Sequence, residues 1–534
     1  MSADLHHPPG GGPDDVAAEV GVTEGPGPVR VSAAPPVVHD AFFLPQLSAA
    51  ELGSLQCRTL RVGGVDLRSP VVTAELVSRV CARLLDAQQN FLAERPVMEV
   101  VQVLGAVVTR WADPAYRWRR VAEELLPMIT GYAPEMVRRG LKEHLSTFRH
   151  DRLLRFVAGD FDNPLVLDGF QPNRAGGRSR AYGPRLMTQV FAGNVPGLPV
   201  WNLICGLLVK SATLGKSASG EPLFPVLFAR SIAEVDPGLA QCLAIVHWAG
   251  GSEEVESAAF AYSDAVTVTG GVGAVASVRA RVPVGMPVVS YGHKVSVAVL
   301  GRESLALNRY ADTARRFARD VSHYDQQGCL SPHAVFVERG GAVDPKTFAA
   351  ALAAEMGRYE QGKPRAELTL TESAAIDRVR TQYEFRSYTD PTGVAVFTSP
   401  VGTAWTVIYE EAPERLEISP LNRVVRVHPV QGVADVVAHL APVRRVLQTV
   451  GVACAPQRLP EWAGLLGGGG VDRICAVGQM PDPAPGWHHD GRGCLSALIR
   501  WVDIEGPAEA ALERYDPEWT TPAGHRSPDP ADPL

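Results

Sequence analysis

Short apolar runs alternate with helical segments through most of the chain, and this alternation constrains the fold more than any other feature of the sequence. Strands are predicted at residues 186–191, 243–246, 265–269, 288–289 and 296–300. Helices are predicted at 71–92, 222–232 and 255–261 and, with proline and glycine interruptions, at 118–142. The segment SATLGKS at 211–217 is expected to be a loop. Strand, turn and helix in rotation are typical of an α/β domain with a parallel sheet.

A second series of the same kind begins near residue 308. Its predicted helices lie at 315–323, 345–356 and 435–440, and its predicted strands at 334–337 and 424–429. A chain of 534 residues is long enough for two or three domains. We therefore expect a cofactor domain followed by a catalytic domain.

The predicted organisation has five parts. Residues 1–38 and 506–534 are rich in proline, glycine and acidic residues and are predicted to be disordered. Between them, residues 39–300 hold N-terminal helices and the cofactor domain. Residues 301–470 form the catalytic domain, and residues 471–505 provide a C-terminal return strand.

Composition excludes several classes of function. The net charge of -7 gives no reason to expect nucleic acid as a partner. The most apolar stretch, 282–300, is interrupted by prolines and by His293 and Lys294, so no membrane span is predicted. The N-terminus lacks the basic and apolar regions of a secretory signal, and a cytoplasmic location is expected. The eight cysteines form no CxxC pair, which disfavours a zinc cage or a disulfide framework.

Other short motifs fail on spacing. The string LGKS at 214–217 lacks the first glycine of a phosphate-binding loop, because that position holds Lys210. No serine lies in a GxSxG motif. His488 and His489 are adjacent, and neighbours on a strand point to opposite faces, so a structural or pocket-lining role is favoured over a metal site. The glycine run at 467–470 is interpreted as a loop.

Gly270, Gly271 and Gly273 follow a predicted strand in the string TVTGGVGAVASV. Glycines at this point let the backbone approach a ligand, and a following helix offers its N-terminus to a phosphate. A tight turn between strand and helix explains the same residues equally well. Taken alone, the motif leaves both interpretations open.

Several segments together resemble the aldehyde dehydrogenase superfamily and, within it, the LuxC-type acyl-CoA reductases. The resemblance runs from about residue 95 to 505 and rests on the order and spacing of FAGNVPGLPVWN, LLVKSATLGKSASGEPLFP, VTVTGGVGAVASV, SYGHKVSVAVLG, DQQGCLSPHAVFVE and GWHHDGRGCLSALIRW. It implies a Rossmann-type cofactor domain, an α/β catalytic domain and a small oligomerisation element. It also implies reduction of an acyl thioester to an aldehyde, with NADPH as the cofactor.

The resemblance implies that Cys329 is the catalytic nucleophile. Gln327 and Ser331 suggest an accessible turn around it, in contrast to the apolar run that contains Cys205. A thiolate exchanges with an acyl thioester at little cost, because the two leaving groups are similar. We expect donors or a helix N-terminus to depress the thiol pKa below about 8.5. Asn194 matches the superfamily residue whose side-chain amide stabilises the tetrahedral oxyanion; a turn before Pro196 is its alternative role.

The cofactor-binding residues are also implied by the resemblance. Lys216 matches the lysine that holds the adenosine ribose and would favour a 2′-phosphate, and Lys210 is a rival for this role. The glycines at 270, 271 and 273 match the turn beside the pyrophosphate. Glu417 matches the glutamate that contacts the nicotinamide ribose.

One departure from the superfamily pattern carries information. Ordinary aldehyde dehydrogenases have a glutamate where this chain has Ser290, in the string SYGHK. That glutamate activates the water that hydrolyses the acyl-enzyme, so its absence favours a reductase over an oxidising dehydrogenase. His293, in the same string, either lines the site or makes structural hydrogen bonds.

The resemblance implies partners as well. The substrate is expected to be an acyl-CoA or an acyl-protein thioester, and an acyl-protein synthetase or a carrier protein is a plausible partner. The segment 486–505 resembles the terminal strand of these proteins and predicts a homo-oligomer. A noncatalytic scaffold with the same fold is the alternative of a different class.

Overall fold

The computed structural model describes residues 38–484, 486–512 and 515. The predicted disordered N-terminal segment lies outside these residues, apart from Val38, and so does most of the predicted C-terminal tail. At the start of that tail, residues Gly506–Leu512 form helix α17. Proline near the first position and a run of alanine and glutamate favour a helix there.

The N-terminal part begins with a small sheet of order β1-β3-β2 and continues with helices. Its strands are β1 (His39–Asp40), β2 (Cys57–Val62) and β3 (Val65–Pro70), and its helices are α1 (Ala49–Ser54), α2 (Ala74–Phe91), α3 (Val97–Ala112), α4 (Arg117–Thr130), α5 (Pro134–Ser146), α6 (His150–Asp160) and η1 (Pro164–Leu167). The predicted helix at 71–92 is confirmed as α2. The interrupted helix at 118–142 is confirmed as α4 and α5, which Gly131 separates with a left-handed φ of 75°.

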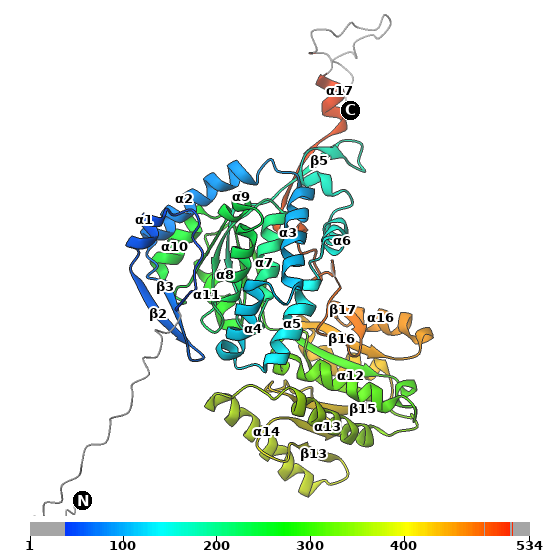
Figure 1. Ribbon diagram of the computed structural model, residues 1–534. Coiled ribbons are helices and arrows are strands. Elements are labelled where there is room, and N and C mark those ends of the chain that lie inside the picture. Colours follow the sequence, from blue (N-terminus) through cyan, green and yellow to red (C-terminus); the bar gives the residue numbers. More distant parts are fainter. Residues whose placement is uncertain (1–37, 485, 513–514, 516–534) are drawn as a thin grey trace, which may run out of the picture. The chain divides into compact units, whose positions relative to one another are not determined.

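The first α/β series forms a parallel sheet of order β10-β9-β6-β7-β8. Its strands are β6 (Leu186–Val190), β7 (Ala212–Lys216), β8 (Leu243–Val246), β9 (Ala265–Thr269) and β10 (Val288–Tyr291), and its helices are α7 (Leu198–Leu208), α8 (Phe224–Ala233), α9 (Pro237–Gln241), α10 (Glu253–Tyr262) and α11 (Val272–Arg281). Helices α3, α7 and α8 lie side by side next to it (Figure 1). The strand order reverses direction between β6 and β9, which is where α/β sheets bind their ligands.

The prediction of a loop at 211–217 is wrong, because Ala212–Lys216 is strand β7. This strand lies between β6 and β8 and is buried along most of its length. A strand covered on both faces has no polar–apolar alternation, so its sequence carried no strand signal. Glycine is required at position 215 by the packing, because a Cβ atom there would lie 2.6 Å from the ring of Phe191.

The second series forms a sheet of order β13-β14-β15-β12-β11-β16-β17, parallel except for β13. Its strands are β11 (Val295–Leu300), β12 (Pro332–Glu338), β13 (Val394–Thr398), β14 (Thr406–Glu410), β15 (Val424–Val430), β16 (Leu447–Ala453) and β17 (Arg473–Ala476). Its helices are η2 (Arg302–Leu305), α12 (Tyr310–Ser322), η3 (His323–Gln326), α13 (Pro345–Gly362), α14 (Leu370–Thr389), α15 (Val433–Leu440), η4 (Ala441–Val446), η5 (Pro456–Arg458) and α16 (Leu459–Gly468).

Both faces of the second sheet are covered, and alternate residues of each strand belong to opposite faces. Val297 and Val299 of β11 pack in a core with residues of α15 and α16, whereas Ala298 and Leu300 pack with α12 and α13. The two predicted α/β series are therefore confirmed. The sheet itself extends beyond the predicted limits of 301–470, because it includes β11 and β17.

A third small sheet, of order β18-β5-β4, joins β4 (Gln171–Pro172) and β5 (Arg178–Tyr182) to the C-terminal β18 (Arg500–Ile504). Only the last part of the predicted strand region 486–505 is therefore extended. The preceding residues form turns and the short helix η6 (Ser496–Leu498), since Gly486, Asp490 and Gly491 have positive φ angles. An oligomerisation role for this sheet remains a prediction.

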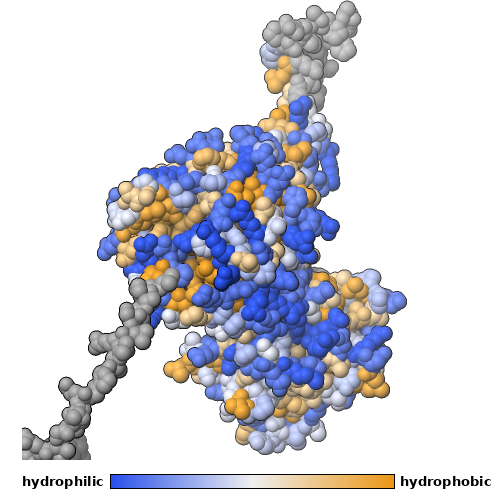
Figure 2. All heavy atoms as spheres, viewed as in Figure 1, coloured by the Kyte–Doolittle hydropathy of each residue, from blue (hydrophilic) through white to orange (hydrophobic). Residues whose placement is uncertain are grey.

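Hydrophilic side chains cover much of the face seen in Figure 2, with apolar residues scattered between them. None of the helices in the described part of the chain combines the length and the apolar character needed to cross a bilayer.

Candidate active site

Two sheet edges meet around Cys329. The carboxyl end of β6 leads to Asn194, and the amino end of β12 follows Cys329. The side-chain amide of Asn194 donates a hydrogen bond to the carbonyl of Gln327 at 2.7 Å, which ties these two edges together. The hydroxyl of Tyr132 donates to the carbonyl of Asn194 at 2.7 Å. Asn194 and Cys329, predicted from separate motifs, are thus brought to the same place.

The turn that carries Cys329 follows an unusual backbone segment. Residues 324–326 all have left-handed φ angles, of 47°, 52° and 66°, and so do residues 421–423, at 66°, 54° and 66°. None of the six is glycine, and each such residue costs roughly 1–3 kcal/mol when the surroundings impose it. The two left-handed turns are joined by hydrogen bonds from Gln326 to Val424 at 2.9 Å and from Gln327 to Asn422 at 3.0 Å. The position of Cys329 therefore depends on both turns.

Cys329 itself is half-buried. Its carbonyl accepts a hydrogen bond from the Ser296 hydroxyl at 2.8 Å, and this hydroxyl accepts one from the Thr449 amide at 3.3 Å. Burial and the carboxylate of Asp490 raise the pKa of the Cys329 thiol to about 11. The expectation of a depressed pKa is therefore wrong for this structure. The hydrogen bond of Gln448 and the charge of Lys294 lower the pKa, but burial outweighs them.

Asp490 belongs to a cluster that sequence reasoning missed. One carboxylate oxygen accepts a hydrogen bond from the Gln448 side chain at 2.7 Å, and the other lies 3.4 Å from the Lys294 ammonium. Lys294 directly precedes β11, and Gln448 is the second residue of β16. Because these strands are parallel to β12, their amino ends share one edge with Cys329. The dipeptide Asp490-Gly491 is a turn signal that could have been found in the sequence. No sequence pattern indicates that Gln448 and Lys294 lie next to it in space.

His489, directly before Asp490, packs against two aromatic rings. The ring of His489 stacks on Tyr291 with a centroid distance of 4.4 Å and lies 4.8 Å from the ring of Trp487. Burial lowers the pKa of His489 to about 4, so its ring is neutral near pH 7. Within the described residues there is no group of three or more histidine, cysteine or acidic side chains that could hold a metal ion.

Ser290, in the position of the superfamily glutamate, accepts a hydrogen bond from Arg279 at 2.7 Å. The carboxylate whose charge helps to raise the pKa of Cys329 is that of Asp490, far along the chain. His293 lies 6.1 Å from His333, measured between ring centroids. Burial lowers the pKa of His333 to about 4, and its Nδ1 accepts a hydrogen bond from the Ser419 amide.

Lys216 lies at the carboxyl end of the first sheet, on the last position of β7. Its ammonium is 5.7 Å from the centre of the Trp248 ring, and burial lowers the pKa of Lys216. The rival Lys210 precedes β7 and therefore lies at the opposite end of that strand. It forms an ion pair with Asp168 at 2.7 Å. Of the two lysines, only Lys216 lies at the edge where α/β sheets bind cofactors.

The same edge carries buried polar atoms without a hydrogen-bond partner among the described residues. They belong to Ser217, Glu221, His247, Trp248, Thr267 and Thr269. Such atoms are rare in folded proteins unless a ligand or water satisfies them. At this edge the backbone of Gly193 lies close to Ala218, because a Cβ atom at Gly193 would lie 2.8 Å from the side chain of Ala218. The residues present thus fit a nucleotide cofactor.

Gly271 caps helix α11 at the end of β9, and Gly270 and Gly273 flank it. A Cβ atom at Gly271 or Gly273 would meet nothing within 4 Å, so tight packing does not require these glycines. A Cβ atom at Gly270, in contrast, would lie 3.2 Å from the side chain of Ala274. A ligand at the N-terminus of α11 remains a prediction.

Glu417 lies beside the second left-handed turn, in the second sheet unit. Its carboxylate accepts hydrogen bonds from Arg426 at 2.9 Å and from the Tyr383 hydroxyl at 3.3 Å. The side chain remains 30% exposed, so it is accessible to a ligand. Contact with a nicotinamide ribose remains a prediction.

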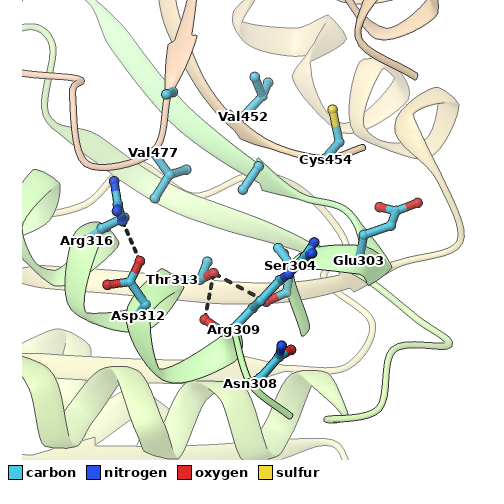
Figure 3. A pocket seen from close by; sticks show the side chains of 12 residues that line it. Glu303, Ser304, Asn308, Arg309, Asp312, Thr313, Arg316, Val452, Cys454 and Val477 are labelled. Carbon is cyan, nitrogen blue, oxygen red and sulfur yellow. Dashed lines mark hydrogen bonds and ion pairs between the residues drawn. The ribbon is translucent and has the colours of Figure 1, made fainter. Parts of the chain in front are cut away.

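A hollow of about 500 Å³ lies at the other end of the second sheet (Figure 3). It is lined by Val452 and Cys454 at the carboxyl end of β16, and by Arg309 and Asp312 at the start of α12. Cys329 precedes β12, whereas Cys454 follows β16, so the two cysteines lie at opposite edges of the parallel sheet. The hollow is therefore separate from the site built around Cys329.

Comparison with known proteins identifies the family of the chain. The acyl-CoA reductase (LuxC) family model matches residues 92–501. A long-chain acyl-protein thioester reductase of Vibrio harveyi is 23% identical over 425 residues, which cover 78% of this chain and 84% of that protein.

Solved structures show the same fold. Aldehyde dehydrogenase 21 of Physcomitrella patens has a TM-score of 0.66 at 12% identity, covering 89% of this chain and 99% of that one. An NADP-dependent glyceraldehyde-3-phosphate dehydrogenase of Bacillus halodurans has a TM-score of 0.62 at 15% identity, covering 85% and 96%. The chain has the aldehyde dehydrogenase fold and belongs to the acyl-CoA reductase (LuxC) family.

Proposed function

We propose that this protein reduces a fatty acyl thioester to the aldehyde with NADPH, through an acyl-enzyme on Cys329. The observation that carries the proposal is the hydrogen bond from Asn194 to Gln327, because it joins the predicted oxyanion donor to the cysteine turn. The family assignment supports the same chemistry.

Each of these residues has a separate role in the proposed reaction. Cys329 attacks the thioester carbonyl and displaces the donor thiol. The side-chain amide of Asn194 has a second N–H, and together with the backbone N–H of Cys329 it stabilises the oxyanion. A bound nicotinamide cofactor supplies the hydride that reduces the acyl group. The cysteine then leaves as a thiolate and the aldehyde is released.

Preference for NADPH is proposed from the surroundings of Lys216. The charges of Lys216 and Arg58 reinforce burial in lowering the pKa of His247 to about 4, so these three groups lie within electrostatic reach of one another. A cluster of this kind suits a 2′-phosphate, whose negative charge also favours protonation of the histidine. The structurally similar dehydrogenase of Bacillus halodurans is NADP-dependent, which is consistent with this choice.

The donor is proposed to be an acyl-protein or acyl-CoA thioester. The Vibrio harveyi relative is named for acyl-protein thioesters, and the family description names acyl-CoA. We also propose a cytoplasmic homo-oligomer that receives its acyl group from an acyl-protein synthetase or a carrier protein. The noncatalytic scaffold is disfavoured by the unsatisfied polar atoms at the cofactor edge, which a scaffold has no need to keep.

The test uses purified full-length protein, NADPH or NADH, and fatty acyl groups presented on CoA or on a carrier protein. Aldehyde formation with loss of NADPH absorbance supports the proposal and ranks the donors. Faster turnover with NADH would contradict the cofactor assignment. Release of free acid would indicate hydrolysis, and absence of nucleotide binding would favour the scaffold.

A further inference from the structure

A carboxylate with no role in the proposed function lies at the sheet edge that carries the nucleophile. Asp490 is 15% exposed, and its two oxygens are held by Gln448 at 2.7 Å and Lys294 at 3.4 Å. Gln448 is followed by Thr449, whose amide donates to the Ser296 hydroxyl at 3.3 Å, and this hydroxyl donates to the Cys329 carbonyl at 2.8 Å. The strand that holds Asp490 through Gln448 is thus tied to the cysteine turn. Nothing in the resemblance assigned a residue to this place.

The resting thiol needs a base. Burial and the negative charge of Asp490 keep the pKa of Cys329 near 11, so the thiol is protonated at neutral pH. The thiolate, not the thiol, attacks a thioester. The neighbouring His489 is held neutral by burial, 3.8 Å from Asp490, and stacks on Tyr291. Asp472 interacts with the same Lys294 and with Asp490, and it directly precedes β17.

We propose that Asp490 is the proton acceptor for the Cys329 thiol and returns this proton to the departing donor thiolate. Gln448 and Lys294 are positioning residues that hold its carboxylate toward the cysteine. The proposal rests on the proposed function, because it assumes that Cys329 attacks a thioester.

The proton balance is complete without any further reactant. The S–H bond of Cys329 breaks, its proton passes to Asp490 directly or through one water molecule, and the sulfur bonds to the carbonyl carbon. The bond from that carbon to the donor sulfur then breaks, and the donor thiolate takes the proton from Asp490. After hydride transfer the Cys329 thiolate leaves the aldehyde, and one proton from solvent restores the thiol.

The backbone conformation at Asp490 allows substitutions that remove the carboxylate without disturbing the turn. Asp490 and Gly491 have φ angles of 54° and 73°, and the Arg492 amide donates to the His489 carbonyl at 3.2 Å, as in a two-residue hairpin turn. Asparagine and glycine favour this conformation at least as well as aspartate. Asp490→Asn and Asp490→Gly therefore remove the carboxylate and keep the turn. Asp472→Asn is the matched control, because it removes a neighbouring carboxylate that interacts with Lys294 and leaves Asp490 in place.

The experiment measures acylation of Cys329 by dodecanoyl-CoA without nucleotide, from the release of CoA and the mass of the protein. Both Asp490 variants are expected to acylate roughly 100-fold more slowly than wild type, and Asp472→Asn at the wild-type rate. The pH dependence of alkylation by iodoacetamide separates chemistry from structure. Alkylation needs only the thiolate, because iodide leaves without a proton, so loss of the carboxylate is expected to make alkylation faster at neutral pH. Acylation is expected to become slower, because no group then passes the proton to the departing donor thiolate.

Each outcome has a distinct meaning. Wild-type acylation rates in either Asp490 variant would overturn the proposal, and so would parallel loss of acylation and alkylation in both. Normal acylation of the wild type without NADPH oxidation would refute the cofactor assignment and leave the role of Asp490 intact. A wild-type protein that no thioester acylates would refute the proposed function, and the role of Asp490 with it.

Discussion

The carboxylate of Asp325 and the guanidinium of Arg423 form an ion pair at 2.6 Å, with side chains 2% and 0% exposed. The pair links the left-handed turn before Cys329 to the left-handed turn at 421–423. The same guanidinium nitrogen donates to the Lys363 carbonyl at 2.9 Å, Nε of Arg423 donates to Asp325 at 2.9 Å, and a backbone amide donates to the second oxygen of Asp325 at 2.9 Å. Both charges are thus compensated where water cannot reach them.

Breaking this ion pair should destabilise the protein. Arg423→Met leaves the Asp325 carboxylate buried without its partner, which costs roughly 3–5 kcal/mol of unfolding free energy. Urea denaturation measures the loss, and turnover should fall as well because the cysteine turn loosens. Arg315→Met, at an exposed pair with Asp312, is the control and should leave the unfolding midpoint unchanged. Equal midpoints for both variants would contradict the structural role of the pair.

Replacing the nucleophile should abolish the reaction. Cys329→Ala removes the only atom proposed to carry the acyl group, so neither an acyl-enzyme nor NADPH oxidation is expected. Cys454→Ala is the matched control, because Cys454 is also half-buried but lies at the opposite edge of the sheet. Mass spectrometry of the acylated protein and NADPH absorbance are the measurements. Residual acyl transfer in Cys329→Ala would exclude the assignment.

Asn194→Ala should slow turnover by roughly 100- to 1,000-fold, the usual effect of losing one oxyanion donor. The loss should appear in kcat, with little change in the Kd for nucleotide, because Asn194 lies at the cysteine turn. Steady-state kinetics and a binding titration distinguish these quantities. A variant with normal kcat would show that Asn194 only shapes the turn before Pro196.

Lys216→Ala should weaken NADPH binding by about tenfold and NADH binding much less, since a charge-assisted contact to the 2′-phosphate is lost. The proximity of Lys216 to Trp248, at 5.7 Å, makes tryptophan fluorescence a suitable readout. Lys210→Met is the control, because that side chain lies at the other end of β7. Equal losses for both nucleotides would contradict a 2′-phosphate contact.

Glu221 should make stability depend on pH. Burial raises the pKa of this carboxyl to about 7, above its ordinary value of 4.5, so between these values the native state binds more protons than the unfolded state. The stabilising effect of the neutral form is therefore present below pH 4.5 and is lost as the pH rises through 7.

The amide of Glu221→Gln keeps an oxygen that can accept the Leu223 and Phe224 amide hydrogens and cannot ionise. We compare the unfolding free energy of this variant with that of the wild type at pH 4 and at pH 8. The difference should shift in favour of the variant by on the order of 3 kcal/mol between pH 4 and pH 8. Urea denaturation at the two pH values measures the difference. The exposed Glu253→Gln should show no such change, and a pH-independent effect of Glu221→Gln would contradict the prediction.

The sequence alone determined the α/β class, the two consecutive series and, through the resemblance, the placement of Cys329 and Asn194. These features are local, because periodicity and motif spacing are properties of neighbouring residues. The same locality explains the error at β7, whose residues show no alternation because neighbouring strands and helices bury both of its faces.

Only the tertiary structure decided what surrounds the nucleophile. Asp490, Gln448 and Lys294 lie on three separate segments and meet because the amino ends of parallel strands share one edge. Strand order is not encoded in any local pattern, so the sequence did not reveal this cluster. The direction of the pKa shift at Cys329 was decided in the same way, because burial and a carboxylate from a distant turn both disfavour the thiolate.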